Sequence, residues 1–400
     1  MAKLKHHSIK MDKQRLIGLI VVLFITIIGV KLIVASHAQS PSLTFSASSG
    51  TIASPAVAVP DTSASSGKVV RFGTMTALSP PSVPTNRAYL GAWVNPNQIT
   101  GGGTGCTGSY TEPGCQEIAA LPNFNQQNGK ALSILHVYTP FNTTANPLSS
   151  SVPLQTLTNI RANGSVPLID WNCTDPHDTN SLATINSGAD DNYITAYAQT
   201  LKSFGSPVFL RWYWEMNLSD PSNINCGGFD TNGSNAGSTA YKAAWIHIWN
   251  IFHQQGATNV AFVWCPSVHN TISASITTYA QYYPGANYVD WIGVDGYDRS
   301  PVDASDFSSI FGTYYSTYSN QNKPIMVAET AAAPDVNTNS SNQSLYLQGI
   351  QSSLPTSFTG IKAVVYFDSD ANNLKWSLQG AGITSFSALS HDSYFSYKSQ

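Results

Sequence analysis

Charged residues are scarce in this chain. Asp, Glu, Lys and Arg make up 10% of its 400 residues, and the formal net charge is −3. No basic patch stands out, which argues against a nucleic-acid partner. The plentiful residues are instead uncharged polar ones and aromatics, so the chain is expected to present a polar but weakly charged surface.

Several signatures of metal and cofactor sites are also missing. The sequence has no CxxC pair, and its nine His form no ligand-spaced pair outside His6 and His7. No Gly-rich phosphate loop follows an apolar run, and Gly101 to Gly103 lie in a long loop without a helix start. We therefore expect neither a metal nor a cofactor. No internal repeat or heptad pattern is present, and we expect a monomer.

The first 38 residues are typical of an export signal. A basic segment, with its last charge at Arg15, precedes the uncharged run Leu16 to Val30, and Ser36-His37-Ala38 resembles a cleavage site. Fifteen apolar residues are short for a membrane span, although Leu16 to Val34 would serve as an anchor if cleavage fails. In either case the remainder is predicted to lie outside the cytoplasm, secreted or anchored to the membrane by this segment.

A Ser-, Ala- and Pro-rich stretch, residues 39–85, is predicted to be a linker, with an early strand near Lys68 to Gly73. Disulfides are permitted outside the cytoplasm. Of the five cysteines, Cys106 and Cys115 flank a short Gly-rich loop, and Cys173 and Cys226 each follow a strand candidate. We therefore hypothesise two disulfide bonds, Cys106–Cys115 and Cys173–Cys226. Cys265 is then left unpaired and is expected to be buried and inert.

Residues 86–400 alternate short apolar runs with longer mixed segments. Eight runs are nearly continuous in apolar residues, as strands buried on both faces are. Strands that alternate with helices pair in parallel, and eight units predict an α/β fold, a (β/α)8 TIM barrel. A doubly wound sheet is the alternative, disfavoured by the missing phosphate loop. The predicted strands are Tyr89 to Val94, Ala131 to Val137, Val166 to Trp171, Val208 to Tyr213, Val260 to Trp264, Trp291 to Val294, Ile325 to Ala328 and Ala363 to Phe367.

Two of these strands finish on a glutamate. Glu215 follows PVFLRWYW, and Glu329 follows KPIMVA. A single Glu after a strand is most often a solvated loop residue. In a barrel, however, strand C-termini open into one mouth, and a carboxylate pair there is what retaining glycoside hydrolysis requires.

Strand alternation predicts the neighbours of these carboxylates. Arg211, Tyr213 and Glu215 are expected on one side of their strand, and Asp295 and Tyr297 on one side of theirs. Tyr297 is then placed to donate a hydrogen bond to Glu329. Ile325 and Val327 are expected on the side of Glu329.

Aromatic residues crowd the same strand ends. Sugar rings have apolar C–H faces that stack on aromatic rings, so several rings around one rim predict a sugar-binding cleft. One Trp at a strand end, taken alone, is more often core. With the residues already named, the candidate binding set includes Trp171, Trp214, Trp264, Tyr366, Trp376 and the polar Asn217.

At this point the sequence resembles glycoside hydrolase family 26 of clan A. RWYWEMN resembles that family's acid/base motif. NVAFVWCPS, YVDWIGVDGYD, KPIMVAET and VVYFDSDANNLKW resemble its fifth to eighth strands in order. The resemblance covers about residues 86–398 and implies a (β/α)8 barrel that cleaves β-linked polysaccharides. It makes Glu215 the acid/base, Glu329 the nucleophile and Tyr297 the support of the nucleophile.

Two positions depart from the family pattern. Trp214 stands where the family usually has a His, and Tyr366 stands where a sugar-stacking Trp is expected. We therefore predict a divergent retaining endo-β-glycanase, with β-1,4-mannan as the first substrate. The alternatives are β-1,3-xylan or mixed-linkage β-glucan as substrate, and a barrel that binds glycan without cleaving it. No cofactor is required, and the polysaccharide is the only expected partner.

Overall fold

A computed structural model describes the protein in separate stretches. These are residues 56–60, 68–72, 78–94, 112–144, 152–173, 181–218, 236–268, 279–299, 306–334, 341–371 and 374–395. The export signal expected in residues 1–38 lies outside them. Within these stretches no helix has the length and apolar character needed to cross a membrane.

The chain divides into two compact units, Met1–Phe72 and Gly73–Gln400. In the first unit, β1 (Ala56–Pro60) pairs antiparallel with β2 (Lys68–Phe72), which confirms the strand expected near Lys68. The boundary predicted between linker and catalytic domain, at residues 85 and 86, stays a prediction.

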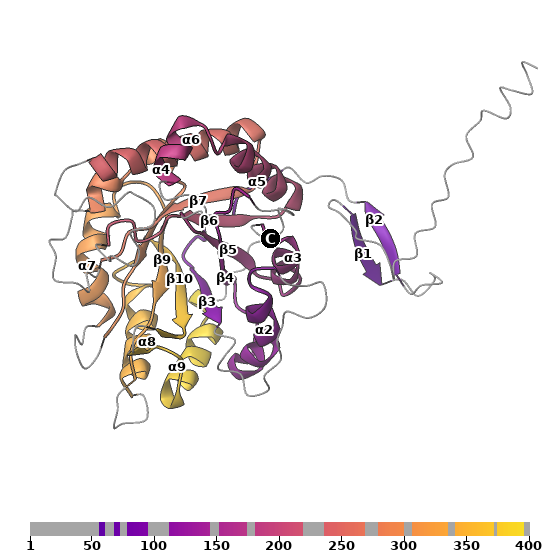
Figure 1. The fold of residues 1–400 in the computed structure, drawn as a ribbon. Coiled ribbons are helices and arrows are strands. Elements are labelled where there is room, and N and C mark those ends of the chain that lie inside the picture. Colours follow the sequence, from indigo (N-terminus) through magenta and orange to yellow (C-terminus); the bar gives the residue numbers. More distant parts are fainter. Residues whose placement is uncertain are drawn as a thin grey trace, which may run out of the picture. The chain divides into compact units, whose positions relative to one another are not determined.

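The second unit is a closed barrel of eight parallel strands, as predicted (Figure 1). Around the ring each strand pairs with the next in chain order, and β10 closes onto β3. The strands are β3 (Tyr89–Val94), β4 (Ile134–Thr139), β5 (Val166–Trp171), β6 (Val208–Trp212), β7 (Val260–Trp264), β8 (Trp291–Asp295), β9 (Ile325–Thr330) and β10 (Ile361–Asp368).

Helices surround the ring of strands (Figure 1). They are α2 (Cys115–Asn128), α3 (Leu154–Ala162), α4 (Ser181–Ser187), α5 (Asp191–Phe204), α6 (Ala236–Gln255), α7 (Phe307–Tyr318), α8 (Ser341–Ser353) and α9 (Gly380–His391). Shorter elements complete the described residues: 3₁₀ turns at Tyr279–Tyr282, Ala286–Tyr288 and Ser393–Phe395, and a hairpin of β11 (Asp370–Ala371) and β12 (Leu374–Lys375).

Two hydrophobic cores follow from strand alternation. Side chains on one face of each strand fill the barrel interior, for example Phe209, Val263 and Met326. Side chains on the other face pack under the helices, for example Leu210, Phe262 and Val327. Both faces are buried, which is why each strand appears in the sequence as a nearly continuous apolar run.

One strand boundary affects the site. The second barrel strand was predicted at Ala131 to Val137, but β4 runs from Ile134 to Thr139. Tyr138 therefore belongs to the strand together with His136, and both alternate with Leu135 and Val137, which pack under the helices. The two polar rings consequently share the interior face with Ile134.

Candidate active site

The chain leaves the extended conformation directly after β6. Tyr213 and Glu215 adopt φ angles of 47° and 52°, a region that non-glycine residues rarely occupy. Hydrogen bonds hold this turn: Tyr213 N donates to the Trp171 carbonyl at 3.1 Å and Glu215 N to the Cys265 carbonyl at 2.8 Å. Such strained backbone persists only where its surroundings fix it, and it is typical of functional sites.

The turn corrects one prediction from alternation. Arg211, Tyr213 and Glu215 were expected on one side of the strand, but Tyr213 lies in the helix-facing core, with its ring 5.4 Å from Tyr241 of α6. Trp214 instead packs against the interior cluster. The expectation fails because alternation holds only for extended backbone, and the two left-handed residues reverse it here.

A β-bulge determines the direction of Glu329. Met326 and Ala328 lie in the barrel interior, whereas Ile325 and Val327 face the helices, so their expected placement beside Glu329 is wrong. The register between β8 and β9 shifts after Val294, and Asp295 then pairs with Glu329. An extra residue at a bulge reverses the alternation. As a result Glu329 follows Ala328 on the inner side.

Arg211 is the centre of a buried ionic network. Its Nε donates to Asp170 Oδ1 at 2.6 Å, and its Nη1 donates to the two Asp295 oxygens at 2.7 and 2.6 Å. Nη2 donates to Asp170 Oδ2 and to Glu329 Oε1. Burial opposes the charged guanidinium, but these carboxylates outweigh it and raise the pKa of Arg211 well above its ordinary value. The arginine is therefore a fixed positive charge beneath the mouth.

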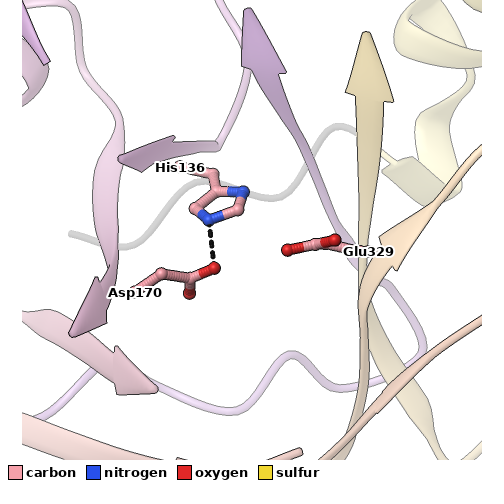
Figure 2. A group of neighbouring side chains, drawn as sticks. All are labelled: His136, Asp170 and Glu329. Atoms are coloured by element: carbon pink, nitrogen blue, oxygen red, sulfur yellow. Dashed lines mark hydrogen bonds and ion pairs between the residues drawn. The ribbon is translucent and has the colours of Figure 1, made fainter. Parts of the chain in front are cut away.

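His136, Asp170 and Glu329 lie together and have metal-binding types of side chain (Figure 2). The imidazole Nε2 is 2.5 Å from Asp170 Oδ2. Arg211 and then His136 overcome the effect of burial and lower the pKa of Asp170. Because Arg211 already donates to both Asp170 and Glu329, its guanidinium supplies the positive charge that a metal would bring.

Glu329 accepts hydrogen bonds on both carboxylate oxygens. Tyr138 OH donates to Oε1 at 2.9 Å, Arg211 Nη2 donates to the same oxygen, and Tyr297 OH donates to Oε2. Burial, and then the charge of Glu329, raise the pKa of both tyrosines well above the ordinary value, so both stay protonated donors. These three contacts from the described residues are all donors, the kind of partner that a carboxylate accepts. The predicted donor Tyr297 is thus in place.

The second glutamate has a different environment. Glu215 is half-buried, and burial followed by the negative charge of Glu329 raises its pKa to about 7. Arg211, a hydrogen bond with Ser267 and the charge of Arg299 act in the opposite direction. Glu215 is therefore set up to hold a proton near neutral pH, whereas its neighbour Glu329 accepts three hydrogen bonds.

Half-buried aromatic rings line the mouth beside Glu329. The Trp93 and Phe367 rings are stacked with centroids 5.1 Å apart, and Tyr138 lies 6.0 Å from Trp93. Trp214 is 5.3 Å from Tyr138, and the Arg211 guanidinium lies 5.6 Å from the Trp214 ring centroid. These rings offer apolar faces to a ligand at the carboxylates.

Other predicted binding residues are not in the mouth. Trp171, Trp264 and Tyr366 are fully buried in the helix-facing core and cannot contact a ligand there. Each lies at a strand position whose side chain points outward, a distinction that apolar runs do not reveal. Tyr366 packs on Phe386 of α9, and its hydroxyl donates to the Trp376 carbonyl at 3.0 Å.

The remaining predicted binding residues contact other residues of the site. Asn217 Nδ2 donates to the Ser267 carbonyl at 2.7 Å and its Oδ1 accepts from Ser267 N at 2.9 Å, which ties two mouth loops together. Asp295 is buried against Arg211. Trp376 is buried and stacks on Tyr297 with centroids 4.5 Å apart.

Sequence reasoning missed His136, Tyr138 and Phe367 as site residues. A usable signal existed for the first two, because ILHVYT places polar rings at alternate positions of an otherwise apolar strand. Phe367 could not be separated from Tyr366 by sequence, since either ring fits the end of β10. The structure decides, because Ala363 and Val365 occupy the interior face and leave Phe367 on it.

Cysteine pairing is partly described. Cys115 and Cys173 are disulfide-bonded, and their expected partners Cys106 and Cys226 lie outside the described residues. Cys265 is free and buried, as predicted. Burial, followed by the charge of Asp295, raises the pKa of its thiol well above the ordinary value, which keeps it protonated and unreactive.

The chain is similar to characterised sequences over part of its length. It is 30% identical over 269 residues to Endoglucanase H of Acetivibrio thermocellus, covering 62% of this chain and 26% of that protein. It is 31% identical over 141 residues to mannan endo-1,4-beta-mannosidase A and B of Caldalkalibacillus mannanilyticus, covering 35% and 23%. The chain thus spans about a quarter of the length of these relatives.

Solved structures agree on the fold. The Bacillus subtilis mannanase man26 matches with a TM-score of 0.52 at 20% identity, over 77% of this chain and 86% of that chain. The catalytic domain of the endo-beta-1,4-mannanase of Bacillus sp. JAMB-750 matches with a TM-score of 0.55 at 13% identity, with the same coverage. At such identities the likeness establishes the barrel alone.

The family assignment rests on sequence. Residues 173–399, more than half of the chain, match the model for glycosyl hydrolase family 26. This segment contains both candidate glutamates, Arg211 and Tyr297. The chain therefore belongs to glycosyl hydrolase family 26.

Proposed function

We propose that this protein is a retaining glycoside hydrolase in which Glu215 is the acid/base and Glu329 the nucleophile. The observation that carries the proposal is the contrast between the carboxyls: the pKa of Glu215 is raised to about 7, while Glu329 accepts three hydrogen bonds. Retaining hydrolysis needs a protonated donor and an ionised nucleophile at one mouth.

The mechanism follows from these states. Glu329 attacks the anomeric carbon while Glu215 donates its proton to the departing glycosidic oxygen. A water molecule then replaces the departed sugar, Glu215 removes its proton, and the glycosyl–Glu329 ester is hydrolysed. Arg211 balances the negative charge that stays buried throughout, and Tyr297 keeps the attacking carboxylate oriented.

The proposed substrate is a β-1,4-mannan cleaved within the chain. A relative named mannan endo-1,4-beta-mannosidase and the family assignment support this choice. The stacked Trp93 and Phe367 and the half-buried Trp214 provide apolar ring faces for pyranose units beside the carboxylates. Neutral sugars also suit a chain in which only 10% of residues are charged.

A β-glucan is the second candidate substrate. The observation that favours it is the match to Endoglucanase H, which covers 62% of this chain against 35% for the mannosidase. Trp214 stands in place of the usual His in the wall of the mouth next to Glu215. A side chain at this position is expected to affect whether mannose or glucose is preferred. Mixed-linkage glucan and β-1,3-xylan therefore belong in the same assay.

We also propose that the enzyme acts outside the cytoplasm, exported by the segment in residues 1–38. The disulfide-bonded Cys115 and Cys173 support this location, since disulfides persist in oxidising compartments. Fractionation of a producing culture tests it. The protein is expected in the medium or on the cell surface and not in the cytosol.

Reducing-end release by the purified protein tests the activity. The panel is mannan, glucomannan, β-1,3-xylan, mixed-linkage glucan and cellulose, with Glu329→Ala and Glu215→Ala as matched variants. Release from mannan that falls by at least about 10³-fold in Glu329→Ala supports the proposal. Release from mixed-linkage glucan alone favours the second candidate. Binding without release from any polymer contradicts the enzymatic function and favours a glycan-binding barrel.

A further inference from the structure

Glu329 has a second tyrosine on its carboxylate. We propose that Tyr138 is a positioning residue that, together with Arg211, holds Oε1 of Glu329 so that Oε2 is the atom that attacks the sugar. The inference rests on the proposed function, because it assigns roles to the two oxygens of the proposed nucleophile. Tyr138 lies outside residues 173–399, the segment that matches the family.

The hydrogen bonds divide unequally between the two oxygens. Oε1 accepts from Tyr138 at 2.9 Å and from Arg211, whereas Tyr297 is the one donor to Oε2 among the described residues. Each carboxylate oxygen has two lone-pair positions. Both positions on Oε1 are therefore used, and one on Oε2 is left for the anomeric carbon.

Tyr138 is held in place from several sides. It projects from β4 on the interior face. Its ring centroid lies 4.5 Å from that of His136 and 5.3 Å from that of Trp214. His136 in turn is bound to Asp170, which is bound to Arg211, so both donors to Oε1 belong to one connected group. Trp214, one of the two residues that depart from the family pattern, thus packs against Tyr138 and helps to fix its position.

The unequal distribution of hydrogen bonds over Oε1 and Oε2 affects both chemical steps. In the first step the bond from Oε2 to the anomeric carbon forms, the bond to the leaving oxygen breaks, and Glu215 supplies the proton to that oxygen. Oε1 becomes the carbonyl oxygen of the ester and keeps Tyr138 and Arg211 as donors. When water cleaves the ester, negative charge returns to the carboxylate, and the Tyr138 hydroxyl is already placed to receive it.

The carboxyl ¹³C chemical shift of Glu329 tests the contact without any need for hydrolysis. The chain has four glutamates, so carboxyl ¹³C labelling of Glu gives four signals, and Glu329→Gln identifies that of Glu329. In Tyr138→Phe at neutral pH the carboxyl ¹³C signal of Glu329 is expected to move away from its wild-type position, since a hydrogen-bond donor to Oε1 is lost. Tyr241→Phe is the control, because the buried Tyr241 hydroxyl meets no partner among the described residues. An unchanged Glu329 ¹³C signal in Tyr138→Phe overturns the proposal.

Kinetics with an activated aryl glycoside tests the assignment of the oxygens. The leaving group of such a substrate departs without a proton from Glu215. The initial burst of released phenol then measures formation of the glycosyl–enzyme, and the steady rate that follows measures its breakdown. Tyr138→Phe is expected to slow breakdown of the glycosyl–enzyme about tenfold, and Tyr297→Phe to affect formation more than breakdown. The reverse order of effects means that Oε1 attacks and overturns the assignment. A moved Glu329 ¹³C signal in a protein that cleaves nothing keeps the contact and overturns both the proposed function and the positioning role of Tyr138 in hydrolysis.

Discussion

The backbone amide of Glu215 donates a hydrogen bond to the carbonyl of Cys265 at 2.8 Å. This bond ties the end of β6 to the residue that follows β7, and the Cys265 Sγ lies 3.1 Å from Asp295 Oδ1 at the end of β8. The proposed acid/base is therefore held by the barrel itself. A left-handed residue fixed in this way keeps its carboxyl inside the mouth, beside Glu329 and Arg211.

The pH dependence of hydrolysis is expected to report Glu215. Its pKa of about 7 means that the fraction able to donate a proton falls as the pH rises through 7. We predict that kcat/KM declines above pH 7, and that Glu215→Gln removes this basic limb while retaining measurable cleavage of aryl glycosides with good leaving groups. Steady-state rates from pH 4 to 9 test it. A decline that persists in Glu215→Gln would assign it to another group.

The same group gives a stability prediction. The folded pKa of Glu215, about 7, exceeds the ordinary value of 4.5, so the folded state binds more protons between these values. Stability therefore falls as the pH rises from about 4.5 to above 7. Glu215→Gln is expected to raise the melting temperature at pH 8 and to change it little at pH 4, as calorimetry can measure. An equal effect at both pH values would contradict the ionisation argument.

Arg211 is expected to be indispensable to the fold as well as to the site. Its guanidinium contacts Asp170, Asp295 and Glu329, and removal leaves buried carboxylates without a counter-charge. We predict that Arg211→Met lowers the free energy of unfolding by about 3–5 kcal/mol. Urea unfolding measures this, with the exposed Arg161→Met as control. A change below about 1 kcal/mol would show that the network is not an ionic one.

The fold could be predicted from the sequence because each barrel strand is an apolar run of five to eight residues that ends in chemically distinctive side chains. The site could be predicted only in part. Glu215 and Glu329 are marked by their motifs, but the directions of their side chains depend on two left-handed residues and a bulge, which alternation does not anticipate. Tyr138 comes from a strand far away in sequence, and only tertiary structure brings it to Glu329.

Phe367 and Tyr366 provide a test of which ring meets the substrate. Phe367 lies in the mouth, and Tyr366 lies under α9. We predict that Phe367→Ala raises KM for the polysaccharide about tenfold, since a stacked ring is lost, with a smaller change in kcat. Tyr366→Phe is expected to leave KM unchanged and to cost about 1 kcal/mol of stability through the lost hydrogen bond to Trp376. A raised KM in Tyr366→Phe would contradict this placement.

Cys265 is expected not to react with thiol reagents in the folded protein. It is free, buried and protonated, with its Sγ against Asp295 and Arg211. Iodoacetamide at pH 8 should label it only after unfolding in guanidinium, and mass spectrometry of the peptide that contains Cys265 measures the extent. Rapid labelling under native conditions would mean that the base of the mouth opens readily.

The stereochemistry of the first product directly tests whether Glu329 is the nucleophile of a retaining enzyme. Two displacements at the anomeric carbon, with Glu329 as nucleophile, return the original configuration. Proton NMR of a digest of the preferred polysaccharide, recorded within minutes and before mutarotation, identifies the anomer that is released. With Glu329 as the nucleophile, the β-anomer is expected to appear first and the α-anomer only later. Initial release of the α-anomer would mean direct attack by water, and would contradict the role of Glu329.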